Sequence, residues 1–375
     1  MAIANGGLYY TPPANIVRMA DDLAFLPAYF SGEGDSVLLK TPPEHDFSKS
    51  RSTIFGLTPR IILQDSPEEI GKERIEPWGW NPRDEFRFKG VSVWTSERKE
   101  LYSRETARKC LMQICDLLPF TEKGIAPSVC RTPEEVRENL SSGTYVLKAP
   151  WSSSGKGLLY TSRNGIEGKD GEWLTGVLRR QGYVMVEKYL DKVMDFAMEF
   201  RSEKGKLEFI GLSAFFTGEN GEYKGNYVGP QIKIIEELER YIGKNTCEQL
   251  QAAVTRALEN IILSHYEGFL GVDMMIYRDR EGNYKVQPCV EINLRYNMGI
   301  LALFLSERYL AAGSTGCFTI RHYPTTEVLK TEHEENLQNT PLATGEGKIK
   351  SGYLNLTPIG EDTRFLATLR IQKED

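Results

Sequence analysis

Two apolar segments in the second half of the chain carry the residues with the most specific chemistry. Asp273 stands within the segment 269–277, and Glu291 and Asn293 stand at the end of the segment 284–293. The polar turn between them predicts a hairpin in which positions 273 and 291 are opposite each other. Two carboxylates and an amide oxygen are the ligands that magnesium prefers. The alternative is a solvent-facing hairpin with an acidic face, but a carboxylate in so apolar a strand requires a partner.

A second segment combines lysines with small residues. The strand-like run 144–148 ends in Lys148, and a loop of small residues follows: Ser152, Ser153, Ser154, Gly155, Lys156 and Gly157. Backbone N–H groups of such residues can close around phosphate oxygens. The pattern differs from a P-loop, because no helix with Lys-Ser or Lys-Thr follows. Alone, it predicts phosphate binding about as well as it predicts an ordinary hairpin loop.

A third segment, 184–190, is predicted to be a strand with polar residues at its end: Glu187, Lys188, Tyr189 and Leu190. Backbone groups there could hydrogen-bond a nucleotide base, with Leu190 packing on the face of the base. Asp195 follows five residues after Leu190 and is placed to accept hydrogen bonds from ribose hydroxyls. A charged strand end is also typical of a solvated turn.

In their order as well as their composition, these three segments resemble the ATP-grasp superfamily. The matching positions lie within residues 100–310 and are Lys148, the loop 152–157, the segment 187–190, Asp273 and the run 291–293. Arg295 extends the last motif to Glu-x-Asn-x-Arg, which is similar to carboxylase-like and carbamoyl-phosphate-synthase-like members. The resemblance implies an α/β ATP-grasp fold preceded by an N-terminal α/β domain.

The resemblance also implies roles for individual residues. Lys148 would bind the α- and β-phosphates of ATP, with Arg104 as the earlier basic contact and the loop 152–157 as a lid. Lys188 and Leu190 would hold adenine through their backbones, and Asp195 would hold the ribose. One or two magnesium ions, with manganese as an alternative, would be held by Asp273, Glu291 and Asn293.

Two positions depart from the usual pattern. The ribose contact is commonly a glutamate, and the spacing from Glu187 to Asp195 is slightly long. Many dipeptide-ligase relatives carry arginine two residues before the metal-binding Asp, where this chain has Gly271. We expect Arg295 to take over the oxyanion-stabilising role, which argues against a D-alanine ligase.

The reaction implied is activation of a small carboxylic acid by the γ-phosphate of ATP. An amine, or less often a thiol, would then attack the acyl phosphate. Arg201 and Arg295 are the candidates for bidentate binding of a carboxylate. The loop 223–231 is a further candidate for substrate contact, although a solvated connection is equally compatible with it. The segments 9–13 and 78–81 are candidates for shaping the acceptor pocket.

Two other functions remain open at this point. A kinase of the same fold would phosphorylate a hydroxyl group and would differ only in its product. A regulatory protein would bind the nucleotide without catalysing a reaction. The three intact candidate metal ligands argue against this alternative, because a protein that only binds nucleotide would not need them.

Bulk composition limits the other partners. The formal net charge is −6, and no basic block or stripe is present that could neutralise a nucleic-acid backbone. No stretch approaches the roughly 20 apolar residues of a membrane helix, and no signal peptide is visible. The 6 cysteines and 4 histidines are scattered, which does not suit zinc or a disulfide framework. We expect a cytoplasmic protein, with no nucleic-acid or membrane partner; a homodimer is compatible with the sequence.

The chain is expected to contain three parts: an N-terminal α/β domain (1–100), an ATP-grasp core (101–315), and a C-terminal tail (316–375) packed on the core. Within the core we expect a lid subdomain (about 144–200) and a metal-binding subdomain (201–315).

Apolar spacing and capping residues predict helices over 103–118, 132–143, 246–265 and 301–312. A capping signature at 66–69 predicts the start of another helix. Strands are predicted at 144–148, 157–161, 183–190, 196–201 and 207–216. A loop rich in Gly and Asn is expected to follow and to lead to the apolar run 231–235. The polar segment 325–347 is expected to be a loop, and the final residues a strand.

Overall fold

A computed structural model of the chain describes residues 3, 10–66, 74–84, 94–152, 157–162, 165–218 and 221–373. Its largest feature is a 9-stranded sheet with the order β11-β10-β7-β8-β9-β12-β15-β14-β13. The strands are β7 (Asp191–Glu203), β8 (Lys206–Thr217), β9 (Tyr223–Val228), β10 (Gly268–Arg278), β11 (Tyr284–Asn293), β12 (Ser314–His322), β13 (Ala343–Gly345), β14 (Lys348–Asn355) and β15 (Phe365–Lys373).

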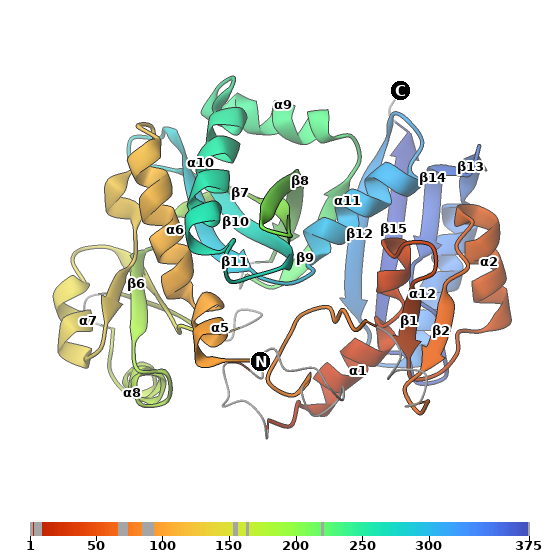
Figure 1. The fold of residues 1–375 in the computed structure, drawn as a ribbon, viewed down its shortest axis with the longest axis horizontal. Helices are drawn as coiled ribbons and strands as arrows, with labels where there is room; N and C mark the ends of the chain where they lie inside the picture. The colour runs from red at the N-terminus through yellow and green to blue at the C-terminus, as the bar shows by residue number, and fades with distance from the viewer. Residues whose placement is uncertain are drawn as a thin grey trace.

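A second sheet of 4 strands has the order β3-β6-β4-β5. Its strands are β3 (Ser128–Cys130), β4 (Thr144–Lys148), β5 (Leu158–Ser162) and β6 (Val184–Lys188). Helices α7 (Pro133–Asn139) and α8 (Lys169–Gln181) accompany it at one end of the molecule (Figure 1). The predicted capping of α7 is confirmed, since the Thr132 side chain accepts a hydrogen bond from the Glu135 N–H.

Helices α6 (Arg104–Leu117), α9 (Gln231–Ile242) and α10 (Thr246–Ile261) cover the first strands of the large sheet (Figure 1). Apolar residues at spacings of three and four place Leu250, Val254 and Leu258 of α10 in the same core as Leu111 of α6 and Val272 of β10. The Ser103 side chain caps α6. This core fixes the N-terminus of α6 beside the end of β11.

The third group of elements combines both ends of the chain. Helices α1 (Ala14–Asp22), α2 (His45–Phe55) and η1 (Leu26–Tyr29) lie with the parallel strands β1 (Ser36–Leu39) and β2 (Arg60–Leu63) next to β12, β14 and β15 (Figure 1). Tyr29 and Phe25 share one core with Leu354 and Leu369, and the Tyr29 hydroxyl donates to the Leu356 carbonyl (2.8 Å). The division of the chain near 100 and 315 stays a prediction.

The remaining helices are α5 (Ser96–Leu101), η2 (Lys123–Ile125), α11 (Met298–Tyr309) and α12 (Thr326–Asn339). None of the helices in the described part of the chain is both long and apolar enough to cross a bilayer. The helix start predicted at 66–69 lies almost wholly outside the described residues.

Two expectations about local structure are wrong. The Gly- and Asn-rich loop contains β9, because Gly225 allows close contact with β12: a Cβ there would lie 2.6 Å from the Phe318 carbonyl oxygen. The apolar run 231–235 that follows this segment is the first turn of α9. The polar segment 325–347 contains α12, which is largely exposed and is capped by the Thr325 side chain.

Candidate active site

The hairpin of β10 and β11 places the predicted metal-binding residues together. Asp273 is the direct cross-strand partner of Glu291, as predicted, and the Asn293 Nδ2 atom donates to Asp273 Oδ2 at 2.9 Å. Burial raises the pKa of Asp273 well above its usual value, and the neighbouring charges of Glu291 and Glu199 raise it further. Burial and the two neighbouring carboxylates disfavour the charged form of Asp273, and a bound cation would offset this cost. The residues therefore fit a cation site.

Asn293 links this cluster to Arg295. The Arg295 NH2 atom donates to Asn293 Oδ1 (2.9 Å), so the amide oxygen points away from Asp273. A metal is bound by an amide oxygen and not by an NH2 group. Ligation beside Asp273 therefore requires the Asn293 amide to turn over, which breaks its contact with Arg295. Among the described residues, no group of three or more His, Cys, Asp or Glu side chains forms a metal site, so the amide is needed to complete the set.

Arg104, the first residue of α6, connects the two sheets at this point. Its guanidinium donates to the Ala149 carbonyl (2.6 Å), to Ser152 Oγ (2.6 Å) and to Glu291 Oε2 (3.3 Å). The first two acceptors lie at the start of the small-residue loop, and the third belongs to the predicted metal site. The structure thus brings the predicted phosphate loop and the predicted metal site to the same arginine.

Lys148 ends β4 next to this arginine. Its ammonium group is ion-paired with Glu187 of β6, and both side chains are largely buried. Lys148, Glu187 and Arg104 line one small cleft between α6 and β6. Arg104 is paired with Glu291 and Lys148 with Glu187, so a phosphate bound in this cleft would share both cations with these carboxylates.

The small-residue loop is closed at its base. The Ala149 N–H donates to the Gly157 carbonyl (2.8 Å), and a Cβ on Gly157 would lie 2.2 Å from the Ser152 Cβ. Only glycine allows the two ends of the loop to approach so closely. Ser153, Ser154, Gly155 and Lys156 lie outside the described residues.

The predicted adenine-binding segment is the end of β6. Strand β3 pairs only with residues 184–186, so Glu187 and Lys188 extend past it, while Tyr145 on β4 still pairs with Lys188. Tyr189 is 53% exposed, and its N–H donates to Thr144 (2.9 Å). Leu190 follows at the connection to β7. Their contacts with adenine stay a prediction.

Asp195 lies on β7 and is already engaged by other side chains. Its Oδ2 atom accepts hydrogen bonds from Lys192 (2.6 Å) and Thr217 (2.7 Å). A ribose hydroxyl would have to compete with these donors, and the ribose role of Asp195 stays a prediction.

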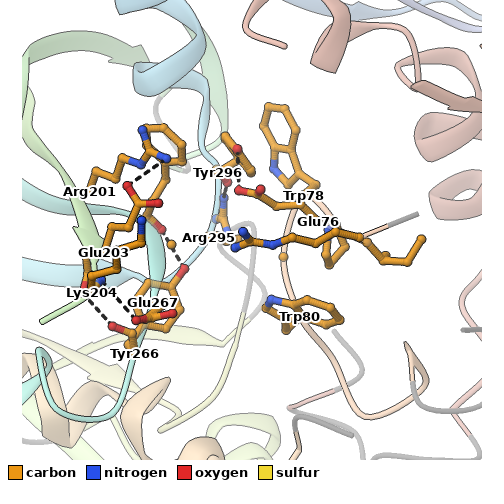
Figure 2. A pocket seen from close by; sticks show the side chains of 17 residues that line it. Glu76, Trp78, Trp80, Arg201, Glu203, Lys204, Tyr266, Glu267, Arg295 and Tyr296 are labelled. Carbon is orange, nitrogen blue, oxygen red and sulfur yellow. Dashed lines mark hydrogen bonds and ion pairs between the residues drawn. The ribbon is translucent and has the colours of Figure 1, made fainter. Parts of the chain in front are cut away.

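A cavity of about 200 Å³ lies at the start of β10, and Arg295, which lines it, connects it to Asn293 of the predicted metal site. Both arginines that we expect to bind a carboxylate, Arg201 and Arg295, line it, as do Trp78, Gly79 and Trp80 of the N-terminal region. Figure 2 shows Arg295 in the middle, with the two tryptophans on one side and Arg201 with Glu203 on the other. Arg201 is ion-paired with Glu203 (3.2 Å), whereas the hydrogen-bond acceptors of the Arg295 guanidinium, Asn293 Oδ1 and the Tyr296 carbonyl, are uncharged. Arg295 therefore keeps the charge that an incoming carboxylate would bind.

Glu199 is a site residue that the sequence did not indicate. It lies on β7, is 1% exposed, and accepts hydrogen bonds from Ser213 Oγ (2.8 Å) and Asn297 Nδ2 (2.7 Å). Cβ atoms on Gly271 and Gly299 would lie 2.3 and 2.1 Å from its carboxylate oxygens. Gly271 thus makes room for Glu199 where many dipeptide-ligase relatives carry arginine, and two glycines facing one strand glutamate were its only signal.

Replacing Glu199 with glutamine should make the protein more stable at alkaline pH. Burial raises the pKa of Glu199 to about 7 from the ordinary 4.5, opposed by the hydrogen bonds from Asn297 and Ser213 and by the Arg295 charge. Because this folded-state pKa is the higher one, the stability linked to protonation is complete below pH 4.5 and is lost as the pH rises towards 7. Glutamine imitates the protonated acid, so at pH 8 the variant should gain up to about 3 kcal/mol in free energy of unfolding.

Urea unfolding at pH 5 and pH 8, without added metal, measures this effect. The difference between variant and parent should be larger at pH 8. A difference that is the same at both pH values would show that Glu199 does not titrate between them.

Comparisons with known proteins bear on the fold. No family profile and no curated protein matches the sequence. Among solved structures, N5-carboxyaminoimidazole synthetase from Staphylococcus aureus, complexed with ADP, is similar with a TM-score of 0.51 and 13% identity over 95% of this chain and 91% of that chain.

Two further similar structures have lower scores. The biotin carboxylase from Campylobacter jejuni has a TM-score of 0.46 and 12% identity over 74% of this chain and 64% of its own. The L-amino acid ligase from Bacillus licheniformis has a TM-score of 0.41 and 14% identity over 88% of this chain and 79% of its own.

The likeness to the synthetase covers nearly the whole chain, and it agrees with the order of the sequence motifs and with the convergence of Lys148, Arg104 and the β10–β11 hairpin. The chain therefore has the ATP-grasp fold.

Proposed function

We propose that the protein is an ADP-forming ligase that uses ATP to join a small carboxylic acid to an amine. The observation that carries the proposal is the position of Arg295. This arginine lines the cavity and, before any metal is bound, donates to Asn293 of the predicted metal site, so it stays next to that site when the amide turns over. A carboxylate bound at Arg295 is thereby held next to the place where the γ-phosphate of ATP would lie.

Nucleotide binding is supported by the charges at the small cleft and by the ADP bound to the Staphylococcus aureus synthetase. We assign the phosphates to Lys148, Arg104 and the loop 152–157. Magnesium fits the oxygen ligands Asp273, Glu291 and Asn293, and when bound it would offset charge on the transferring phosphoryl group. Manganese shares this preference for oxygen ligands and is retained as an alternative.

In the first step, a carboxylate oxygen of the acid attacks the γ-phosphorus. The new P–O bond forms as the bond from that phosphorus to the bridging oxygen breaks, and ADP leaves. In the second step, the amine nitrogen attacks the acyl carbon. A C–N bond forms, the C–O bond to phosphate breaks, and the departing phosphate or solvent takes the proton that nitrogen loses.

The side chains contribute mainly positioning and charge. Arg295 holds the carboxylate and then the oxyanion that forms on the acyl carbon. Arg201 lies on the opposite wall and, paired with Glu203, is suited to orient the rest of the substrate. Arg104 holds the loop and the hairpin together, so phosphates and metal stay in register.

The test is a screen of ADP release over pairs of small acids and amines with magnesium and ATP, followed by mass analysis of the product. A ligase gives ADP, phosphate and an amide in equal amounts. A stable phosphate ester would instead identify a kinase, and the absence of any ADP release across broad mixtures would contradict turnover.

The wider setting of the enzyme also remains a proposal. We assign it to the cytoplasm with small-molecule partners and no nucleic acid. We keep the domain limits 1–100, 101–315 and 316–375, and a homodimer as a candidate assembly.

A further inference from the structure

Aromatic side chains form most of the apolar surface of the cavity. Trp78 and Trp80 come from the N-terminal region, Tyr266 from the connection before β10, Phe269 from the start of β10, and Tyr296 from the position after Arg295. The rings of Phe269 and Tyr296 are 4.8 Å apart and tilted, and Tyr296 is stacked on Phe30 at 4.5 Å. These rings support one another, so their positions are set before a ligand enters.

The acidic groups of the cavity already have donors. Glu76 accepts from the Tyr296 hydroxyl (2.7 Å), Glu203 pairs with Arg201 (3.2 Å), and Glu267 accepts from the Lys204 N–H (3.1 Å). Arg74 and Lys204 also line the cavity, and Arg295, whose hydrogen-bond partners are uncharged, is the basic residue that contacts the predicted metal site. An anionic group is favoured at that end of the cavity.

The stem of Arg295 is held in place by the N-terminal segment. A Cβ on Gly79 would lie 2.9 Å from the Arg295 Cβ, and the Tyr296 N–H donates to the Trp78 carbonyl (2.9 Å). The two tryptophans on either side of Gly79 lie near Arg295, as Figure 2 shows. A ligand in the cavity can therefore contact the tryptophan rings and the Arg295 guanidinium at the same time.

The size of the cavity suits a ligand with one ring. A buried space of about 150 Å³ can hold one benzene molecule. The cavity of about 200 Å³, which is partly open to solvent, has room for one ring and a carboxylate.

We propose that the acid substrate belongs to the single-ring aromatic carboxylic acids, with its carboxylate on Arg295 and its ring against Trp78, Trp80 and Phe269. This inference rests on the proposed function for the carboxylate's reaction, but not for its binding. Aromatic rings pack on one another in offset or edge-to-face arrangements, which aliphatic acids of equal charge cannot imitate.

Calorimetric titration without ATP or magnesium tests the binding directly. The probes are acetate, cyclohexanecarboxylate, benzoate, phenylacetate and 2-naphthoate. Benzoate or phenylacetate should bind at least about tenfold more tightly than acetate and more tightly than the cyclohexane acid, because ring packing adds about 0.5–1.5 kcal/mol to area burial. Arg295→Met should weaken benzoate binding by about ten- to a hundredfold, the usual worth of a charged hydrogen bond.

Trp80→Leu should reduce the preference for benzoate over cyclohexanecarboxylate, while Trp173→Phe on α8, outside the cavity, should leave it unchanged. Equal affinity for acetate and benzoate, or benzoate binding that neither Arg295→Met nor Trp80→Leu alters, would overturn the inference. If ring acids bind but no acid–amine pair releases ADP, the proposed function fails, and the inferred binding of single-ring aromatic acids stands. If only aliphatic acids support ADP release, the proposed function stands and the inferred aromatic substrate is wrong.

Discussion

Replacing Glu291 with glutamine should slow ADP release by about a hundredfold or more, the range seen when one preorganised electrostatic contact is removed from an active site. Glutamine keeps the size of the side chain but removes one negative charge from the pair with Asp273. It also deprives Arg104 of its carboxylate partner at 3.3 Å. Magnesium–ATP should bind more weakly for the same reason. Steady-state rates and calorimetry with and without a chelator measure both effects.

Glu237→Gln is a matched control, because Glu237 is an exposed member of an ion pair with Arg240 on α9. This control should retain the parent rate and nucleotide affinity. Parent-like behaviour of Glu291→Gln, together with ATP affinity that a chelator does not change, would remove the metal assignment from the hairpin.

Replacing Arg295 with lysine should lower turnover by about a hundredfold while leaving the affinity for magnesium–ATP near normal. The guanidinium reaches Asn293 Oδ1 and the Tyr296 carbonyl with two different nitrogens, at 2.9 and 3.0 Å. A lysine ammonium keeps the charge but cannot present the planar fork to a carboxylate. The values of kcat and KM for the acid, together with nucleotide affinity, separate the two effects.

Arg240→Lys is the corresponding control, because Arg240 lies on the surface of α9, forms an exposed ion pair with Glu237 and does not line the cavity. This variant should keep the parent turnover. Full activity of Arg295→Lys with the true substrate would show that Arg295 only supports the strand end. A parallel loss of nucleotide affinity and turnover would place Arg295 at the phosphates and not at the acid.

The parts of the site that could be predicted are those with a local pattern. Period-two alternation and a turn centred near Gly282 predict that Asp273 is opposite Glu291, and the pairing of the strands confirms it. A lysine at the end of an apolar strand locates Lys148. Arg104 was proposed only through the resemblance, and the structure adds its contacts with Ser152 and Glu291, residues 48 and 187 positions away.

The parts that could not be predicted depend on contacts between distant segments. Glu199 is one charged residue in an apolar strand, and its partners Ser213 and Asn297 become neighbours only when the sheet forms. The glycine and asparagine of β9 resemble loop residues, yet Gly225 allows contact with β12 and Asn226 donates to Ala214 (3.3 Å). Composition cannot distinguish a flexible glycine from one that a neighbouring strand requires.

Strand β15 has a consequence for the order in which the protein can mature on the ribosome. It lies between β12 and β14, and it pairs with β12 along its whole length, from Ser314–Lys373 to His322–Phe365. Until β15 has been synthesised, β13 and β14 lack the strand that pairs them with the rest of the large sheet, and β12 presents an open edge. The core that holds Tyr29, made among the first residues, also waits for Leu369. Nascent chains halted before residue 365 should therefore need chaperone protection, although every proposed site residue has already been translated.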